Sequence, residues 1–210
     1  MKKGVLVCAA VLVLAVLVAA PASAASKKVD FGFKLGLSSS NNKWTDDDGT
    51  ENALTEATYG GLAIINLSPN IGLQVEIDYL ITGETWPSVE YDTVKERFGY
   101  LHIPVLFRYK FMKEGKFIPV AFAGPVISFL VSAYETGYGD VEDFFKSTDF
   151  GLDMGLGAEF ALGNIKALID FRYYMGLTNV YSAPDFVIMA VPMDFTMKNA
   201  AFMLTVGIIL

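Results

Sequence analysis

The strict alternation of apolar and polar side chains between residues 71 and 83 constrains the fold of this chain more than any other feature. In "IGLQVEIDYLITG" every odd position from Ile71 to Ile81 is apolar or aromatic, whereas Gln74, Glu76 and Asp78 occupy even positions. Successive side chains of a β-strand point to opposite faces of the sheet, so this period predicts a strand with one apolar and one polar face. The period alone does not say whether the apolar face meets a protein core or lipid.

Seven further segments have strand character, and most show the same division between an apolar and a polar face. The eight segments are 29–38, 57–66, 71–83, 100–111, 117–134, 150–160, 165–176 and 199–210. The links between them alternate between long and short, which in an up-and-down sheet places every long loop at one end. Long loops opposed to short turns around an even number of strands are typical of bacterial outer-membrane barrels. The sequence therefore predicts an all-β fold, an eight-stranded antiparallel up-and-down transmembrane β-barrel.

The first 24 residues are predicted to be a cleaved secretory signal peptide, which leaves residues 25–210 as a single barrel domain. Lys2 and Lys3 precede a long apolar run, and Ala22 to Ala24 supply the small residues that signal peptidase requires. An uncleaved membrane anchor is the alternative, because the apolar run is only slightly shorter than a membrane-spanning helix. The single cysteine, Cys8, lies in this segment, so the mature domain is expected to have no disulfide or thiol chemistry.

Charge and the distribution of apolar residues argue against two classes of protein. The chain carries a net charge of −7, which does not favour nucleic acid as a partner. Beyond residue 24 no apolar run approaches the roughly 20 residues of a transmembrane helix. The hydrophobic residues, 53% of the chain, are instead divided among alternating strands. Together with the predicted signal peptide, this pattern indicates export to the bacterial outer membrane, with membrane lipid as the first partner.

The polar face favours lipid on the outside of the barrel. It is rich in glycine, for example Gly32, Gly155 and Gly157, and small residues suit the crowded inside of a narrow barrel better than a water-facing surface. The alternative is a secreted, soluble calyx of the lipocalin kind, in which the faces are inverted and the apolar side holds a small apolar ligand.

Charged residues of both signs are expected to fill the lumen. The predicted network consists of Asp30, Lys34, Glu76, Asp78, His102, Arg108, Lys110, Asp153, Glu159, Lys166, Asp170 and Arg172. Buried charges must be paired, and Glu76 and Asp78 are expected to pair with Arg108 and Lys110 on the next strand. Because side chains just fill an eight-stranded barrel, no large passive channel is predicted, although a small-solute channel stays as an alternative.

No enzyme, cofactor or metal site is predicted. His102 is the single histidine, and we expect it to be a hydrogen-bonded structural residue, since a catalytic role would require an activated serine beside it. Asp153 and Glu159 are six residues apart on one face, roughly 20 Å along a strand, which is too far for a carboxylate pair. The acidic segment 46–51 lacks the full ligand spacing of a calcium loop, so we interpret it as a solvated loop.

Two long loops, 83–98 and 178–198, combine aromatic and apolar residues with charge. They are candidates for binding an envelope protein or a surface glycan, with Trp86, Tyr91 and Phe186 as the candidate contacts. The alternative is that both loops simply pack over the mouth of the barrel.

Several motifs resemble those of the PorT-like outer-membrane β-barrel family. They are "FGFKLGLSSS", "LQVEIDYLITG", "GYLHIPVLFRYKF", "FIPVAFAGPVISFLVSA" and "GLGAEFALGNIKALIDFRYYMGLTNV", and they extend over residues 29–210. The most specific element is Tyr100, Leu101, Ile103 and Pro104 followed by Arg108 and Tyr109. The resemblance implies an eight-stranded barrel reached through a signal peptide. It implies little about activity, because the family's namesake is associated with protein secretion and most members have no assigned role.

Overall fold

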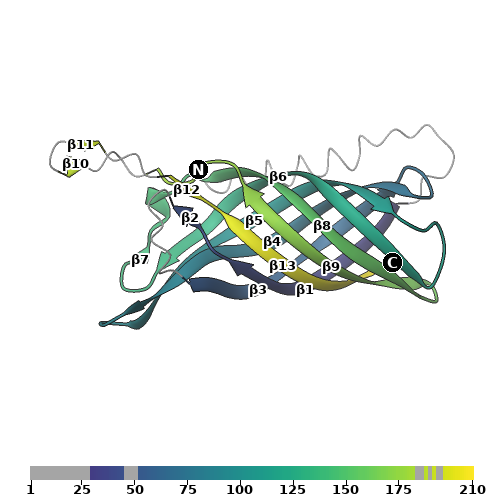
Figure 1. The fold of residues 1–210 in the computed structure, drawn as a ribbon, viewed down its shortest axis with the longest axis horizontal. Coiled ribbons are helices and arrows are strands. Elements are labelled where there is room, and N and C mark those ends of the chain that lie inside the picture. The colour runs from purple at the N-terminus through teal and green to yellow at the C-terminus, as the bar shows by residue number, and fades with distance from the viewer. Residues whose placement is uncertain (1–28, 45–51, 183–186, 189–190, 193–195) are drawn as a thin grey trace.

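The eight predicted strands are present and form a closed barrel. The structure is a computed structural model that describes residues 29–44, 52–182, 187–188, 191–192 and 196–210. Within these residues the long strands are β1 (Val29–Ser40), β3 (Asn52–Asn66), β4 (Ile71–Ser88), β5 (Asp92–Lys110), β6 (Phe117–Glu135), β8 (Thr148–Leu162), β9 (Ile165–Gly176) and β13 (Ala200–Ile209). Each pairs antiparallel with the next, and β13 pairs with β1, so the sheet has no free edge (Figure 1). The predicted fold class is therefore confirmed.

The two ends of the barrel differ in their connections. Residues 67–70, 111–116 and 163–164 make the short turns at one end, where the C-terminus also lies. The short elements gather at the opposite end in Figure 1: β2 (Lys43–Trp44), β7 (Gly139–Asp140), η1 (Glu142–Phe144), β10 (Val187–Ile188), β11 (Val191–Pro192) and β12 (Met197–Lys198). We call these the turn end and the loop end.

The predicted long loop over residues 83–98 is wrong, because this segment is a β-hairpin. Strand β4 continues to Ser88, β5 begins at Asp92, and three residues join them. Asp92 adopts a positive φ of 61°, a conformation that aspartate tolerates in tight turns. The hairpin extends beyond the apolar part of the barrel. Its backbone pairing continues there, but its side chains no longer alternate between apolar and polar, because this part of the strands does not separate lipid from the lumen.

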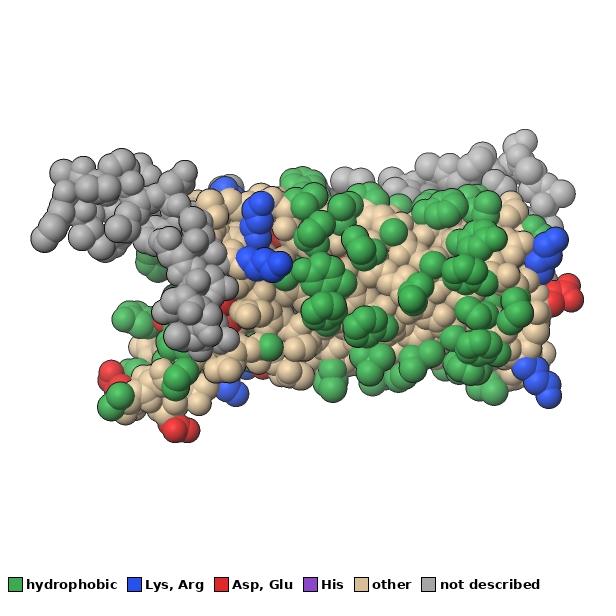
Figure 2. All heavy atoms as spheres, in the orientation of Figure 1, with side chains coloured by type: hydrophobic (Ala, Val, Ile, Leu, Met, Phe, Trp, Pro, Cys, Tyr) green, Lys and Arg blue, Asp and Glu red, His purple; other side chains and the backbone are tan. Residues whose placement is uncertain are grey.

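The apolar face of each strand points outward. On β1, Phe31, Phe33, Leu35 and Leu37 are each about half exposed, whereas Lys34 between them is buried. Figure 2 shows the resulting apolar belt on the side of the barrel wall that faces the viewer. On β4, Glu76 and Asp78 are buried inside, which assigns the polar side of the alternation to the lumen. This arrangement is the reverse of a soluble calyx.

The lumen contains apolar layers as well as polar ones. Near the turn end, Leu62, Ile64, Leu168 and Ile209 form a buried apolar cluster. Two further clusters lie towards the loop end: Leu80, Val126, Tyr174, Ala201 and Met203 form one, and Phe98, Tyr100, Ala133, Val141, Val180 and Met197 form the other. The inward residues of β3, which is apolar on both faces, supply part of the first cluster. Among the described residues, no helix is long and apolar enough to cross a membrane.

Candidate functional site in the barrel lumen

Inward-facing polar side chains form three groups along the barrel. The central cluster comprises Lys34, Glu76, Asp78, His102, Ser128, Asp153, Asp170 and Arg172. The turn-end cluster comprises Asp30, Asn66, Arg108, Lys110, Glu159 and Lys166. The loop-end cluster comprises Thr82, Tyr100, Asp149, Tyr174 and Asn199. All twelve residues of the sequence-predicted charge network lie in the first two groups.

An ion pair between Arg172 and Glu76 crosses the full width of the lumen. Arg172 belongs to β9 and Glu76 to β4, which are four strands apart in either direction around the ring. The guanidinium makes two parallel contacts, Nη1 to Oε2 at 2.7 Å and Nη2 to Oε1 at 2.9 Å. This bidentate geometry is the strongest form of the arginine–carboxylate interaction. The pair therefore ties opposite walls of the barrel together.

Neighbouring side chains complete the charge balance around this pair. Asp153 Oδ2 lies 3.0 Å from Arg172 Nη1, and Lys34 Nζ lies 2.9 Å from Asp78 Oδ2 and hydrogen-bonds Glu76. Every one of these side chains is at least 97% buried. Buried charges are tolerated only when they are paired, and here the paired residues come from four different strands.

His102 lies between Ser128 and Asp153, in the order of a Ser–His–Asp triad. Its Nδ1 is 2.9 Å from Ser128 Oγ, and its Nε2 is 3.3 Å from Asp153 Oδ2. The exposed fraction of each side chain is at most 1%, so no substrate can reach the serine in this closed barrel. Asp153 is also bound by Arg172. The geometry therefore supports a structural hydrogen-bond chain; the serine partner was missed because strand 117–134 alternates only weakly.

The expected pairing of Glu76 and Asp78 with Arg108 and Lys110 is wrong. In the register of β4 and β5, Arg108 lies opposite Gly72 and Asp78 lies opposite His102. Gly72 precedes Glu76 by four residues, about 13 Å along a strand. The two basic residues are thus closer to the turn end than the two acids.

Glu159 is the acid that Arg108 and Lys110 contact. Its Oε1 lies 2.5 Å from Arg108 Nη1 and 3.7 Å from Lys110 Nζ. Lys166 Nζ lies 3.4 Å from the same carboxylate and 3.5 Å from Asp30. The turn-end cluster is therefore a second charged layer, separate from the central one.

The loop-end cluster was not predicted from the sequence. Asp149 accepts hydrogen bonds from Tyr174 Oη at 2.7 Å and from Asn199 Nδ2 at 2.8 Å, and Asn199 accepts one from Thr82 Oγ1 at 3.0 Å. Asp149 and Asn199 lie at the edges of predicted strands, where the alternation gives no reason to place them inside. The cluster links β4, β8 and β9 near the loop end.

Three glutamates face one another across the base of the β4–β5 hairpin. Glu96 lies opposite Glu84 on β4 and opposite Glu135 on β6. The group lies beyond the apolar belt, outside the membrane-spanning part of these strands. Burial, together with the charges of Glu84 and Glu135, raises the pKa of Glu96 to about 8. This carboxyl group is therefore largely protonated at neutral pH.

The remaining predicted residues lie in or near the hairpin and the loops. Trp86 is part of β4, and Tyr91 is an exposed residue of the hairpin tip. Phe186 and the acidic segment 46–51 lie outside the described residues. Over the part of the chain that the structure describes, His, Cys, Asp and Glu side chains form no group suited to hold a metal ion.

Comparisons with known proteins agree with this architecture. Residues 20–182 match the family model described as outer membrane protein beta-barrel domain. No functionally curated protein matches the sequence significantly.

Two solved structures illustrate the likeness in fold. Neisserial surface protein A (NspA) is 14% identical, with a TM-score of 0.55 over 87% of this chain and 98% of that chain. OprG from Pseudomonas aeruginosa is 14% identical, with a TM-score of 0.52 over 88% of this chain and 97% of that one.

Arg172→Met is expected to destabilise the barrel by about 3–5 kcal/mol, because Glu76 and Asp153 lose the cation that they share. Arg172→Lys keeps the charge but loses the bidentate contact, so its effect should be smaller. The measurement is the urea midpoint of unfolding, with the folded fraction determined from the mobility shift on boiling in detergent. Lys116→Met, at an exposed turn position, is the matched control. Equal midpoints for Arg172→Met and Lys116→Met would contradict the role assigned to Arg172.

Glu96→Gln is expected to stabilise the protein increasingly as pH rises. The raised pKa means that the folded state holds a proton that the unfolded state releases above its ordinary pKa near 4.5. Wild-type stability should therefore fall between about pH 5 and pH 8, whereas the neutral glutamine does not titrate. Thermal unfolding of both proteins at pH 5, 7 and 9 measures the difference. Glu90→Gln, at the exposed hairpin tip, is the control; a constant difference across this pH range would refute the prediction.

Proposed function

Because the chain belongs to the outer membrane protein beta-barrel domain family, we propose that it is a small outer-membrane barrel that is closed to solutes and acts through its loop end. The ion pair from Arg172 to Glu76 across the lumen carries this proposal. Membership of the family places the chain in the outer membrane, where the apolar belt contacts lipid. The soluble-calyx alternative is thereby excluded.

Side chains occupying the lumen at several levels support a closed barrel. Above and below the central cluster lie the loop-end and turn-end clusters, with apolar clusters between and beyond them. Eight-stranded barrels have interiors that side chains just fill. An ion would have to break the buried pairs of Arg172 and Lys34 in order to pass, and breaking such pairs is costly. A small-solute channel is the less favoured alternative.

The hairpin supports a structural or surface-interaction role at the loop end. It carries β4 and β5 beyond the apolar belt, and Val89 and Tyr91 at its tip are exposed. Tyr138 and Phe144, in the connection after β6, add exposed aromatic area at the same end. Exposed aromatic residues on a rigid support suit binding to a protein or a glycan. Export by a signal peptide over residues 1–24 and membership of the PorT-like subgroup are further parts of the proposal.

The closed lumen predicts no steady conductance. The purified, heat-modifiable protein is inserted into planar bilayers, and a general porin prepared in the same way serves as the positive control. We expect traces at background level, because the charged clusters block the axis. Reproducible conductance steps of constant size would contradict the proposal and favour the small-solute channel.

Trimming the hairpin is expected to abolish surface interactions and leave the barrel intact. Thr85 and Lys95 lie opposite each other, so an Asn-Gly turn can replace residues 86–94 without changing the register. In cells, the protein with a full-length hairpin and a photoreactive residue at position 138 should form cross-linked adducts with its partner. After trimming, the same photoreactive residue should form no adducts. The mobility shift on boiling confirms that the trimmed barrel folds. Unchanged adducts after trimming would remove the hairpin from the proposed role.

A further inference from the structure

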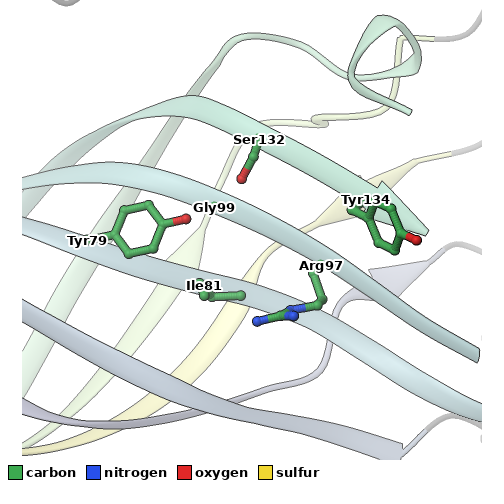
Figure 3. A pocket seen from close by; sticks show the side chains of 6 residues that line it. All are labelled: Tyr79, Ile81, Arg97, Gly99, Ser132 and Tyr134. Atoms are coloured by element: carbon green, nitrogen blue, oxygen red, sulfur yellow. The ribbon is translucent and has the colours of Figure 1, made fainter. Parts of the chain in front are cut away.

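A depression in the outer wall of the barrel lies outside every lumen cluster. It has a volume of about 160 Å³ and is lined by Tyr79 and Ile81 of β4, Arg97 and Gly99 of β5, and Ser132 and Tyr134 of β6 (Figure 3). Gly99 lies opposite Ile81 on one side and Ser132 on the other, so the depression crosses three adjacent strands. One extra residue on β6, Val131, forms a bulge beside Gly99.

Two hydroxyl groups converge over Gly99. A Cβ atom at this position would lie 2.5 Å from both Tyr79 Oη and Ser132 Oγ. Figure 3 shows both oxygen atoms directed towards the glycine from opposite sides. Because Gly99 has no side chain, its backbone forms the floor of the depression, and the two hydroxyl groups form its walls.

Arg97 contributes a guanidinium group to the depression, and this group is paired with one carboxylate. Its side chain is 43% exposed, and its Nη2 lies 2.9 Å from Glu56 Oε1. A guanidinium has five N–H donors, so one carboxylate does not use all of them. Lys95 is an exposed residue two positions further along the same face of β5. Arg97 and Lys95 thus place two cations on the same outward face of β5, although the whole chain has a net charge of −7.

The depression lies at the boundary of the apolar belt. The outward apolar rows end at Ile81 on β4, at Leu101 on β5 and at Phe129 on β6. The next outward residues are Gly99, Arg97, Ser132 and Tyr134. Ile81 therefore faces acyl chains, while Arg97 reaches the level of the polar headgroups, where tyrosine hydroxyls also prefer to lie.

We propose that this depression binds the phosphate of a phosphorylated lipid headgroup in the membrane leaflet at the loop end. A guanidinium and nearby hydroxyl donors form the charge-assisted hydrogen bonds that phosphate prefers. The occupant is a lipid because Ile81 continues the depression into the apolar belt, where the acyl chains of a bound lipid would lie. The site is on the barrel wall and is independent of any partner bound by the hairpin.

Native mass spectrometry of the intact barrel in detergent micelles containing lipid A tests the proposal. The wild type should retain one lipid A molecule, and Arg97→Gln should weaken its binding about tenfold. A second variant, Ser132→Ala with Tyr79→Phe, removes the two hydroxyl groups that converge over Gly99 without changing the charge and should weaken binding less. Lys116→Gln, at an exposed turn-end position, is the charge-matched control. The mobility shift on boiling shows that each variant is folded.

Two further probes separate the possible sources of binding. Dephosphorylated lipid A should bind no better to the wild type than to Arg97→Gln, and inorganic phosphate at millimolar concentration should not displace lipid A. Equal retention of lipid A by Arg97→Gln and Lys116→Gln would overturn the proposal. If the wild type retained dephosphorylated lipid A as well as it retains lipid A, the depression would make only ordinary apolar contact with the lipid. Displacement of lipid A by inorganic phosphate would make it a free-anion site. Each of these results also overturns the lipid headgroup site.

Discussion

Backbone N–H and C=O groups find no water to bond with inside a membrane, so a sheet in lipid must have no edge. In this protein the pairing of β1 with β13 meets that requirement. The other main features follow from it. Closure by eight strands fixes a lumen just wide enough for side chains, outward positions must be apolar, and inward polar groups must find partners within the barrel.

The central cluster shows how a narrow lumen accommodates long charged side chains. Arg172 reaches the opposite wall, and its guanidinium carbon lies 4.9 Å from the centroid of the Phe122 ring. Inward glycines provide the space around such side chains. A Cβ atom at Gly155 would lie 2.7 Å from the same ring, and one at Gly60 would collide with the carboxylate of Asp78. Glycine weakens a strand, but here it lets a neighbouring strand place a large or charged side chain in the lumen.

The fold could be predicted because alternation reports directly on two unlike environments, as it does between Ile71 and Ile81. The identity of the buried partners could not, because it depends on register and on contacts across the ring. Arg108 pairs with Glu159 of β8 rather than with the acids of β4. The hairpin was taken for a loop because polar residues lie on both of its faces beyond the apolar belt, so the alternation stops there although Val94 and Glu96 are buried. The triad-like position of Ser128 follows from packing around His102.

One part of the wall is joined by side chains instead of by the backbone. Strands β3 and β4 lose their regular pairing between Ala53 and Tyr59. Across this gap, Thr58, Ser38 and Ser40 donate hydrogen bonds to the carbonyl oxygens of Tyr79, Ile81 and Gly83. Side-chain hydroxyls can rotate away, whereas a regular ladder opens cooperatively. The barrel therefore has a mechanically compliant seam, and amide hydrogens beside it should exchange with solvent earlier than those elsewhere in the wall.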